Sequence, residues 1–442
     1  MKNIDLTTGN ITKKLWIFSL PLMLGNVLQQ FYNLADTWVV GRFIGSNALA
    51  AVGSSYTLMT FLNSVIIGLC LGAGTFFSVA LGQKDLKKIK NGKFISLVII
   101  GTLSLITGAV VYFGWRGIIG LMQIPSELFE ITGEYLACVS FGVFALFIYN
   151  YYACFLRGIG NSGTPLIFLG VSVVLNIGLD FYFVAVLGSG IKGAAVATVI
   201  SQYIAGVGIA VYSFVKYPRF RVGMADISFN SETLKSIASL SGFTCLQQSV
   251  MNFGILAVQG IVNSFGAAVM SAFAVAVKID TVAYMPVQDF GNGFSTFVAQ
   301  NYGAKKPQRI KTGIKQSVIS VALFCVAIST VVCVFAPWFM KIFISPSESE
   351  IIEIGVKYLR IEGVFYLGIG ILFMLYGYFR AVDKPVVSVV LTVISLGTRV
   401  LLAALLSKIS SVGVIGIWVS IPIGWFLADI AGVVLMKKIK QF

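Results

Sequence analysis

Four polar residues stand in apolar surroundings with the types and spacing of a cation site. Asp36 lies in the stretch NLADTWVVG. Asp180 follows Asn176 by four residues in VLNIGLDFYF, so the Asn176 and Asp180 side chains share one helical face. Thr198 lies in the next apolar segment. Carboxylate, amide and hydroxyl oxygens suit sodium, and two carboxylates that repel each other also suit a proton. If the three helices pack together, we expect one cation site; interhelical hydrogen bonding without an ion is the alternative.

Further acidic residues lie at membrane depth in the second half of the chain. Asp280, Asp289 and Glu362 each interrupt an apolar segment, where an ionisable side chain is costly and usually marks a substrate or ion pathway. We interpret them as candidate countercharges for a cationic substrate in a cleft. Pairing with Arg399 or Lys278 inside the same half is an equally good explanation.

Aromatic residues and one proline accompany these groups. Tyr32, Tyr149 and Tyr152 are candidates for lining the cleft and holding lipophilic cations by cation–π contact, although ordinary membrane packing explains them equally well. Pro21 lies fifteen residues before Asp36 and removes a backbone hydrogen bond from the same helix, which permits a kink. A helix that bends near an ion-binding residue is a candidate switch, and a static kink is the alternative.

The composition is that of an integral membrane protein. Of the 442 residues, 57% are hydrophobic and 11% charged, and the mean hydropathy is +0.91. The apolar stretches are long enough for helices that cross a bilayer in about 20 residues, and too long for the strands of a barrel. The chain has no histidine, which excludes a histidine metal site or a catalytic triad. We therefore predict no enzyme and no cofactor besides a coupling ion, sodium or a proton.

The apolar stretches divide into twelve predicted transmembrane helices. The first follows Lys2, Lys13 and Lys14 but is too long for a signal peptide. The predicted spans are 14–40, 47–80, 94–115, 132–156, 164–188, 191–215, 234–263, 267–300, 314–338, 352–380, 386–408 and 412–436.

Basic residues predict the orientation of these spans. Of the 32 lysines and arginines, few fall in loops on the side opposite the N-terminus. Those few are Arg42, Arg116, Lys192, Lys341 and Lys408. Because cytoplasmic loops retain positive charge, we expect both termini in the cytoplasm and the protein in a plasma (inner) membrane. Topology thus accounts for most of the net charge of +15, and nucleic-acid binding is not needed to explain it.

An internal repeat divides the chain into two similar halves. At offsets of 221 and 223 the chain matches itself, in pairs that include Gly45 with Gly266, Gly72 with Gly293, Gly92 with Gly313, Tyr135 with Tyr358, and Arg157 with Arg380. The second half has Ala257 where the first has Asp36, and Arg399 where it has Asn176, so we expect coupling-ion binding chiefly in the first half. The predicted domains are an N-terminal lobe (1–220), a cytoplasmic linker (221–233) and a C-terminal lobe (234–442).

Six spans in each half make the two halves parallel repeats related by a pseudo-two-fold axis along the membrane normal. Two such lobes can rock about a central cleft, which favours a transporter with alternating access over a channel that gains its pore from oligomer symmetry. The internal repeat removes the need for a dimer, so we expect a monomer.

Several segments together resemble the multidrug and toxic compound extrusion (MATE) family. They are PLMLGNVLQQFYNLADTWVVGRFIGSNALAAVG, LRGIGNSGTP, LNIGLD and VAQNYGAKKPQRIKTG. The resemblance covers all twelve spans and implies a pair of six-helix lobes that antiport cationic or amphipathic drugs against sodium or protons. It also implies that Asp36, Asn176, Asp180 and Thr198 match a cation site of the N-terminal lobe and that Pro21 matches a proline tied to bending.

One position departs from the family pattern. Where one branch of the family has a glutamate in helix seven, this chain has Gln247 and Gln248, which puts an ion site in the second lobe in doubt, although Glu362 stays a candidate there. The main alternative function is a flippase for a lipid-linked oligosaccharide or peptidoglycan precursor. That activity would need a strongly cationic cleft, whereas the intramembrane charges here are mainly acidic. A non-transporting receptor would need a long extramembrane loop, which the sequence does not offer.

Overall fold

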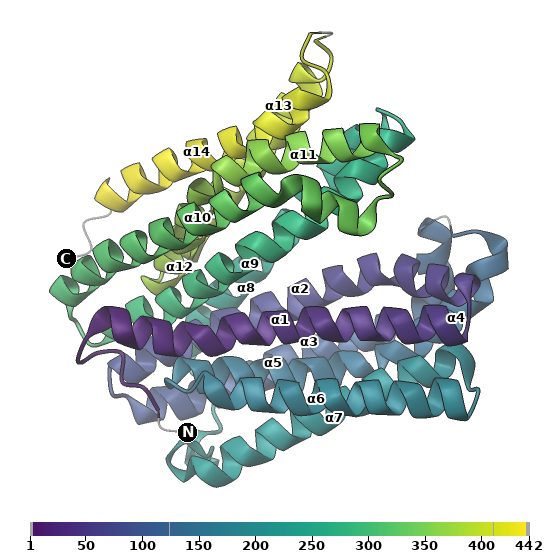
Figure 1. Ribbon diagram of the computed structural model, residues 1–442. Helices are drawn as coiled ribbons and strands as arrows, with labels where there is room; N and C mark the ends of the chain where they lie inside the picture. Colours follow the sequence, from purple (N-terminus) through teal and green to yellow (C-terminus); the bar gives the residue numbers. More distant parts are fainter. Residues whose placement is uncertain (1–2, 123, 410, 439–442) are drawn as a thin grey trace. The chain divides into compact units, whose positions relative to one another are not determined.

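A computed structural model describes residues 3–122, 124–409 and 411–438, and the described residues form helices without any strand (Figure 1). The α-helices are α1 (Ile11–Phe43), α2 (Ser46–Gly82), α3 (Leu86–Leu121), α4 (Ser126–Ser140), α5 (Gly142–Gly158), α6 (Gly163–Asp180), α7 (Gly190–Lys216), α8 (Ser231–Asn263), α9 (Ala267–Gly303), α10 (Pro307–Phe343), α11 (Ser349–Val364), α12 (Tyr366–Ala381), α13 (Pro385–Leu406) and α14 (Val414–Lys438). A π-helix, η1 (Phe181–Val186), and two 3₁₀ turns, η2 (Pro218–Phe220) and η3 (Met224–Asp226), complete the described elements.

Each of the twelve predicted spans coincides with a helix or a pair of consecutive helices. In the described part of the chain, nine helices are long and apolar enough to cross a membrane, and two bent pairs pass the same test together. Helix α1 completes the twelve. Its Asn26, Gln29 and Gln30 make it less apolar than the other spans, but it coincides with the first predicted span, 14–40.

The structure corrects the predictions of single unbroken helices over 132–156 and 352–380. The chain bends by 41° between α4 and α5 and by 53° between α11 and α12. At each bend a backbone N–H turns to the carbonyl three residues back, Phe141 to Cys138 and Phe365 to Glu362, which breaks the regular α-helical ladder. Neither bend contains a proline, and the two occupy corresponding places in the repeat.

The helices pack into two compact units. The first unit comprises Met1–Asp5 and Leu20–Cys245, and the second comprises Leu6–Ser19 and Leu246–Phe442. The beginning of α1 therefore belongs to the second unit, and the beginning of α8 belongs to the first.

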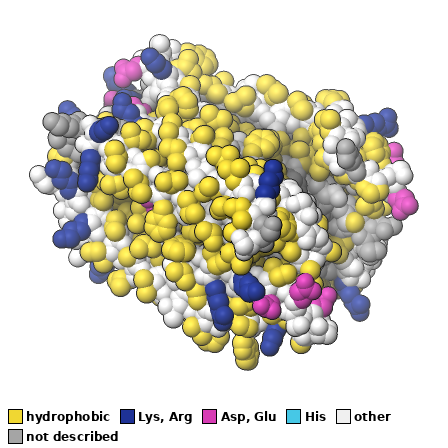
Figure 2. Space-filling view, turned by 90° about the horizontal axis from the view of Figure 1, so that it is seen from above, with side chains coloured by type: hydrophobic (Ala, Val, Ile, Leu, Met, Phe, Trp, Pro, Cys, Tyr) yellow, Lys and Arg dark blue, Asp and Glu magenta, His cyan; other side chains and the backbone are white. Residues whose placement is uncertain are grey.

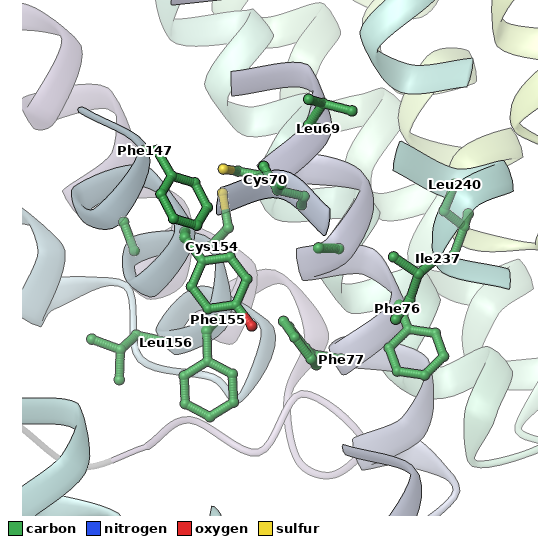
Figure 3. Close-up of a cluster of buried hydrophobic side chains, with 14 of the residues drawn as sticks. Leu69, Cys70, Phe76, Phe77, Phe147, Cys154, Phe155, Leu156, Ile237 and Leu240 are labelled. Atoms are coloured by element: carbon green, nitrogen blue, oxygen red, sulfur yellow. The ribbon is translucent and has the colours of Figure 1, made fainter. Parts of the chain in front are cut away.

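A phenylalanine-rich core holds the first unit together (Figure 3). The Phe77 ring packs edge-on against Phe155 with 5.2 Å between centroids, and α8 adds Ile237 and Leu240 to the same cluster. Gly72 of α2 lies directly against the α8 backbone at Leu240 and leaves no space for a Cβ. Because Gly72 has no side chain, the beginning of α8 can pack closely against α2 in the first unit.

The second unit receives the beginning of α1 in the same way. Gly293 of α9, the repeat partner of Gly72, faces the Ser19 side chain at a distance that leaves no room for a Cβ. The Trp16 ring lies 5.4 Å from that of Phe290, and Thr12 donates a hydrogen bond of 3.0 Å to the Gln316 side chain. The glycine pair of the repeat therefore marks the two places where the first helix of one half enters the other unit.

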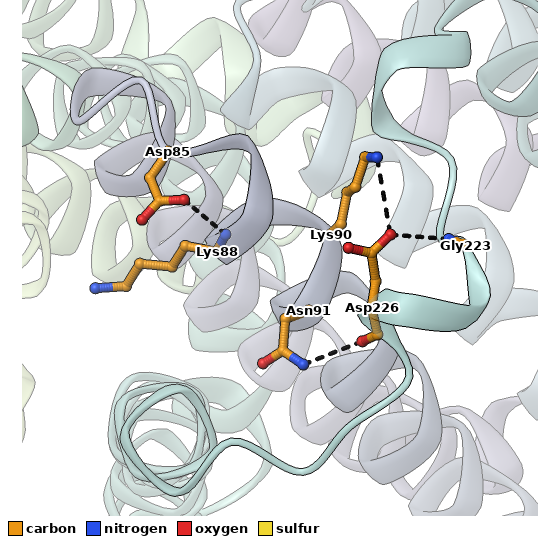
Figure 4. A network of polar contacts seen from close by, with 6 residues as sticks. All are labelled: Asp85, Lys88, Lys90, Asn91, Gly223 and Asp226. Atoms are coloured by element: carbon orange, nitrogen blue, oxygen red, sulfur yellow. Dashed lines mark hydrogen bonds and ion pairs between the residues drawn. The ribbon is translucent and has the colours of Figure 1, made fainter.

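A polar network fixes the linker to α3 in the first unit (Figure 4). Asp226 accepts a hydrogen bond from the Gly223 N–H at 2.9 Å and lies 3.7 Å from the Lys90 ammonium. The Asn91 amide donates to the Asp226 carbonyl at 3.1 Å, and the Asp85 carboxylate caps the start of α3 by accepting from the Lys88 N–H. The linker is thus an ordered part of the first unit.

The surface agrees with a membrane environment. Figure 2 shows hydrophobic side chains over most of the face in view, with lysines and arginines chiefly near its edges. Large apolar side chains such as Phe113, Leu121 and Val174 are 83%, 87% and 72% exposed. Apolar exposure on this scale fits contact with lipid rather than with water.

Candidate cation site

The two candidate residues of α6 lie where that helix changes character. Asn176 and Asp180 are both fully buried, one turn apart, and α6 packs against α7. Directly after Asp180 the chain widens into the π-helix η1, with the Leu187 N–H bonded to the Tyr182 carbonyl five residues back. Wide turns of this kind are frequent at functional sites because they loosen the regular backbone ladder.

Thr198 of α7 joins α1 and α6 through one oxygen. Its hydroxyl oxygen accepts hydrogen bonds from the Tyr32 hydroxyl at 3.2 Å and from the Asn176 side-chain nitrogen at 3.4 Å. This hydrogen bond to Thr198 identifies which end of the Asn176 amide is the nitrogen, so the other end is the oxygen. Its oxygen, Oδ1, is buried and has no hydrogen-bond partner among the described residues.

The carboxyl groups of Asp36 and Asp180 interact directly across α1 and α6. Both oxygens of Asp180 are buried, and neither has a hydrogen-bond donor within the described ranges. The charged neighbours that act on this pair are carboxyl groups, and no described lysine or arginine balances them. The structure therefore brings Asp36, Asn176, Asp180 and Thr198 together, with three buried oxygens left without a donor.

Two of the tyrosines that we predicted for a cleft are engaged in packing within the first unit, and the third belongs to the cluster just described. Tyr149 donates to the Pro165 carbonyl at 3.0 Å, and the Lys93 ammonium lies over the Tyr152 ring at 5.4 Å. Tyr32 bonds to Thr198, as described above. Pro21 lies inside α1, which runs without interruption from Ile11 to Phe43.

The acidic residues of the second unit form a different cluster. Asp280 of α9 and Glu362 of α11 are 4% and 1% exposed, and their carboxyl groups interact. Arg399 lies near enough for its charge to act on both, but it forms no ion pair with either carboxyl in the part of the chain that the structure describes, so the pairing stays a prediction. Lys278 is exposed, and Asp289 is buried nine residues beyond Asp280 on α9.

The sequence analysis missed two polar residues with functional potential. Tyr135 of α4 interacts with Asp36, Asp180 and Tyr32, and its match to Tyr358 in the repeat was the signal that could have identified it. Asp429 of α14 is 7% exposed, and its Oδ1 has no described hydrogen-bond partner. It lies close to the charged end of the last helix, so hydropathy did not single it out.

The ligand set of the first unit suits a small monovalent ion. Among the described residues, no group of three or more histidine, cysteine, aspartate or glutamate side chains is placed to hold a metal ion. The site instead offers two carboxyls, one amide oxygen and one hydroxyl, which can bind sodium or hold a proton without the charge that a divalent ion demands.

Comparison with known proteins gives a consistent result. A family model described as MatE matches residues 21–182 and again 244–405, one match in each half of the repeat. The chain is 31% identical over 396 residues to the probable multidrug resistance protein YpnP of Bacillus subtilis, covering 89% of this chain and 88% of the relative.

Solved structures share the fold over the whole length. A MOP superfamily transporter from Pyrococcus furiosus superposes with a TM-score of 0.91 at 25% identity, covering 99% of this chain and 98% of the other. The outward-facing conformation of a multidrug resistance MATE family transporter gives a TM-score of 0.90 at 25% identity, with the same coverage.

Proposed function

The chain belongs to the MatE family, and from this premise we propose that it exports organic cations or amphipathic drugs by antiport against sodium or protons. The multidrug resistance relatives support export, and the multi-pass fold supports a transporter embedded in a membrane. The proposal places the protein in the plasma membrane as a monomer with both termini in the cytoplasm.

The observation that carries the proposal is the set of buried oxygens without donors in the first unit. Asn176 Oδ1 and both oxygens of Asp180 are acceptors in a place where unpaired acceptors are costly. A sodium ion, or a proton on the carboxyl pair, would satisfy them. No described lysine or arginine competes for the pair, so the site must take its positive charge from outside the chain.

Antiport requires that the ion change the balance between two conformations. Asp36 lies on α1, and Asn176 and Asp180 lie on α6, so a bound ion ties these two helices together and its release leaves two carboxyls that repel each other. Pro21 lies earlier in α1 and lacks the N–H that would hold a regular helix there, which gives α1 a place to bend. Ion binding and release would thereby alter the position of α1.

The test is export of a fluorescent lipophilic cation from proteoliposomes, with sodium and proton gradients imposed separately. Wild type should respond to one of the gradients, and that response identifies the coupling ion. Asp36→Asn keeps the size of the side chain but removes its charge, and we expect it to insert normally and to respond to neither gradient. If wild type ignores both gradients, drug export by antiport is wrong, and flipping of a lipid-linked precursor should be assayed.

A further inference from the structure

The short segment before α1 is bound to the second unit through its main chain. The Arg309 guanidinium of α10 donates two hydrogen bonds to the Leu6 carbonyl, at 3.1 and 3.2 Å. The same side chain donates to the Thr8 carbonyl at 2.7 Å and to the Gly9 carbonyl at 2.8 Å. Gly9 has a φ of 68°, in the left-handed region that favours glycine. One arginine thus binds three carbonyls of a turn that favours glycine.

Two further side chains of the second unit bind the same segment. Asn301 of α9 donates to the Leu6 carbonyl at 3.2 Å, and the Lys306 ammonium donates to the Thr7 carbonyl at 2.9 Å. Leu6 itself is fully buried. Hydrogen bonds from a charged donor are stronger than those between neutral groups, so the basic residues contribute most of the attachment. Asn301, Lys306 and Arg309 together form what we call the clamp.

One face of α1 continues the attachment that the clamp begins. Thr12, Trp16 and Ser19 recur at helical spacing, so their side chains share one face of the helix. Each of the three contacts a residue of α9 or α10, as described above. The first turns of α1, as far as Ser19, are therefore fixed to the same unit as the clamp.

Pro21 lies where α1 changes its packing partners. On this helix the residues of the second unit end at Ser19, and those of the first unit begin at Leu20. Gly25 already faces α6 of the first unit, since a Cβ added there would lie 3.6 Å from the Leu169 side chain. Pro21 has no N–H to continue the helical ladder, so α1 bends more easily here. The chain thus has a fixed segment, a point of weakness and then the segment that carries the cation site.

We propose that Arg309 is a positioning residue for ion-coupled transport, because it fixes the start of α1 through the clamp. When the ion leaves Asp36 and α1 bends at Pro21, the clamped end stays with the second unit, so the displacement falls on the end that carries Asp36. Without the clamp, ion release would displace the free start of the helix instead. This inference rests on the proposed function, because it requires that ion binding and release move α1.

The first measurement is hydrogen exchange of the purified protein in detergent, which reports how easily backbone amides open. Arg309→Gln removes the charge and most of the donors, so we expect residues 6–14 to exchange about tenfold faster, with residues 30–43 unchanged. Arg309→Lys keeps the charge but not the planar fork of donors, and it should not restore the wild-type exchange. Lys311→Gln removes an exposed charge from the same helix and is the matched control, in which exchange should stay as in wild type.

The second measurement is export from proteoliposomes against the concentration of the coupling ion. We expect the maximal rate of Arg309→Gln to fall severalfold, while the ion concentration for half-maximal export stays as in wild type, because the ion site itself is intact. Asp36→Asn should instead lose the response to the ion altogether. Gly9→Ala disturbs the clamp from the side of the turn, since alanine rarely adopts this φ, and it should reproduce the result of Arg309→Gln.

Two results would overturn the inference. One is wild-type exchange of residues 6–14 in Arg309→Gln or in Arg309→Lys, which would show that the fork of donors does not hold the segment. The other is a folded Arg309→Gln protein that exports at the wild-type maximal rate, whatever its dependence on the ion. If Arg309→Gln does not fold, Gly9→Ala decides by the same two measurements.

Failure of the proposed function is a separate outcome. If wild type ignores both ion gradients, antiport is wrong, and the coupling role of Arg309 is wrong with it. Faster exchange of residues 6–14 in Arg309→Gln would still establish the clamp as the attachment of α1, because hydrogen exchange requires no transport.

Discussion

At the scale of single residues, the cation site is defined by which oxygens have donors and which do not. Thr198 accepts from both Tyr32 and Asn176, so its hydroxyl orients the amide, and Asn176 Oδ1 stays buried without a hydrogen-bond partner among the described residues. Thr198 therefore has a positioning role as well as its proposed role as a ligand.

Tyr135→Phe tests the residue that the sequence analysis missed. The Tyr135 side chain lies in the electrostatic neighbourhood of Asp36 and Asp180, where its hydroxyl can donate to a bound-state carboxyl; loss of one hydrogen bond to a charged group costs about 1 kcal/mol or more. We expect the ion concentration for half-maximal transport to rise roughly fivefold, with little change in maximal rate. The measurement is export from proteoliposomes against the concentration of the coupling ion. Tyr56→Phe, at an exposed tyrosine of α2, is the matched control, and an unchanged ion dependence in Tyr135→Phe would exclude Tyr135 from the site.

The residues of this site were predictable to different degrees. Asp36 and Asp180 are conspicuous because a charge in an apolar segment needs an explanation, and Asn176 follows from its helical spacing to Asp180. Tyr135 is an ordinary residue in a membrane helix; its match to Tyr358 in the repeat is a weak signal, and its position near Asp36 and Asp180 is what makes it a candidate. The Tyr149 hydroxyl donates to the Pro165 carbonyl, a contact that the sequence does not indicate, and its place in a cleft stays a prediction.

At the scale of helices, the glycines of the repeat act as contact points. Gly72 lies against the α8 backbone, and Gly293 lies against Ser19 of α1, so each unit accepts a helix that begins in the other half of the sequence. The repeat identified these glycines as a pair. It did not predict that the beginnings of α1 and α8 are exchanged, because such packing depends on contacts far apart in sequence.

Gly72→Ala should destabilise the protein by roughly 1 to 3 kcal/mol, since the added Cβ would meet the backbone at Leu240 and Ser241 and one helix must move. The measurement is thermal denaturation in detergent, where the midpoint should fall. Gly53→Ala on the same helix is the control, because a Cβ at Gly53 meets nothing within 4 Å and helix propensity favours alanine. Equal midpoints for the two variants would show that the contact at Gly72 is not tight.

The bends of the fourth and tenth predicted spans could not be read from hydropathy, because a straight and a bent helix carry the same apolar composition. Both bends lack proline, the residue that sequence reasoning uses to place a kink. They lie where one backbone N–H, that of Phe141 or of Phe365, bonds to the carbonyl three residues back instead of four. The repeat alone hints at them, since the two sites correspond.

At the scale of the whole molecule, the sequence carried most of the information about the fold. Composition and span length predicted an all-helical membrane protein with twelve spans, and the self-match predicted two similar halves. The comparison with solved transporters confirms this plan, and the MatE model matches once in each half. Orientation in the membrane follows from charge alone and stays a prediction.

Cysteine labelling tests that orientation. In a variant with all six native cysteines replaced, Met224→Cys in the linker and Ser347→Cys between α10 and α11 place one exposed thiol on each predicted side. A maleimide that cannot cross membranes should modify Ser347→Cys in intact cells and Met224→Cys only after permeabilisation, with the cysteine-free parent as the background control. The reverse pattern would place both termini outside. The loops rich in lysine and arginine include the linker, whose Asp226 pairs with Lys90. An inverted protein would have to carry these charged loops across the membrane, which the positive-inside rule strongly disfavours.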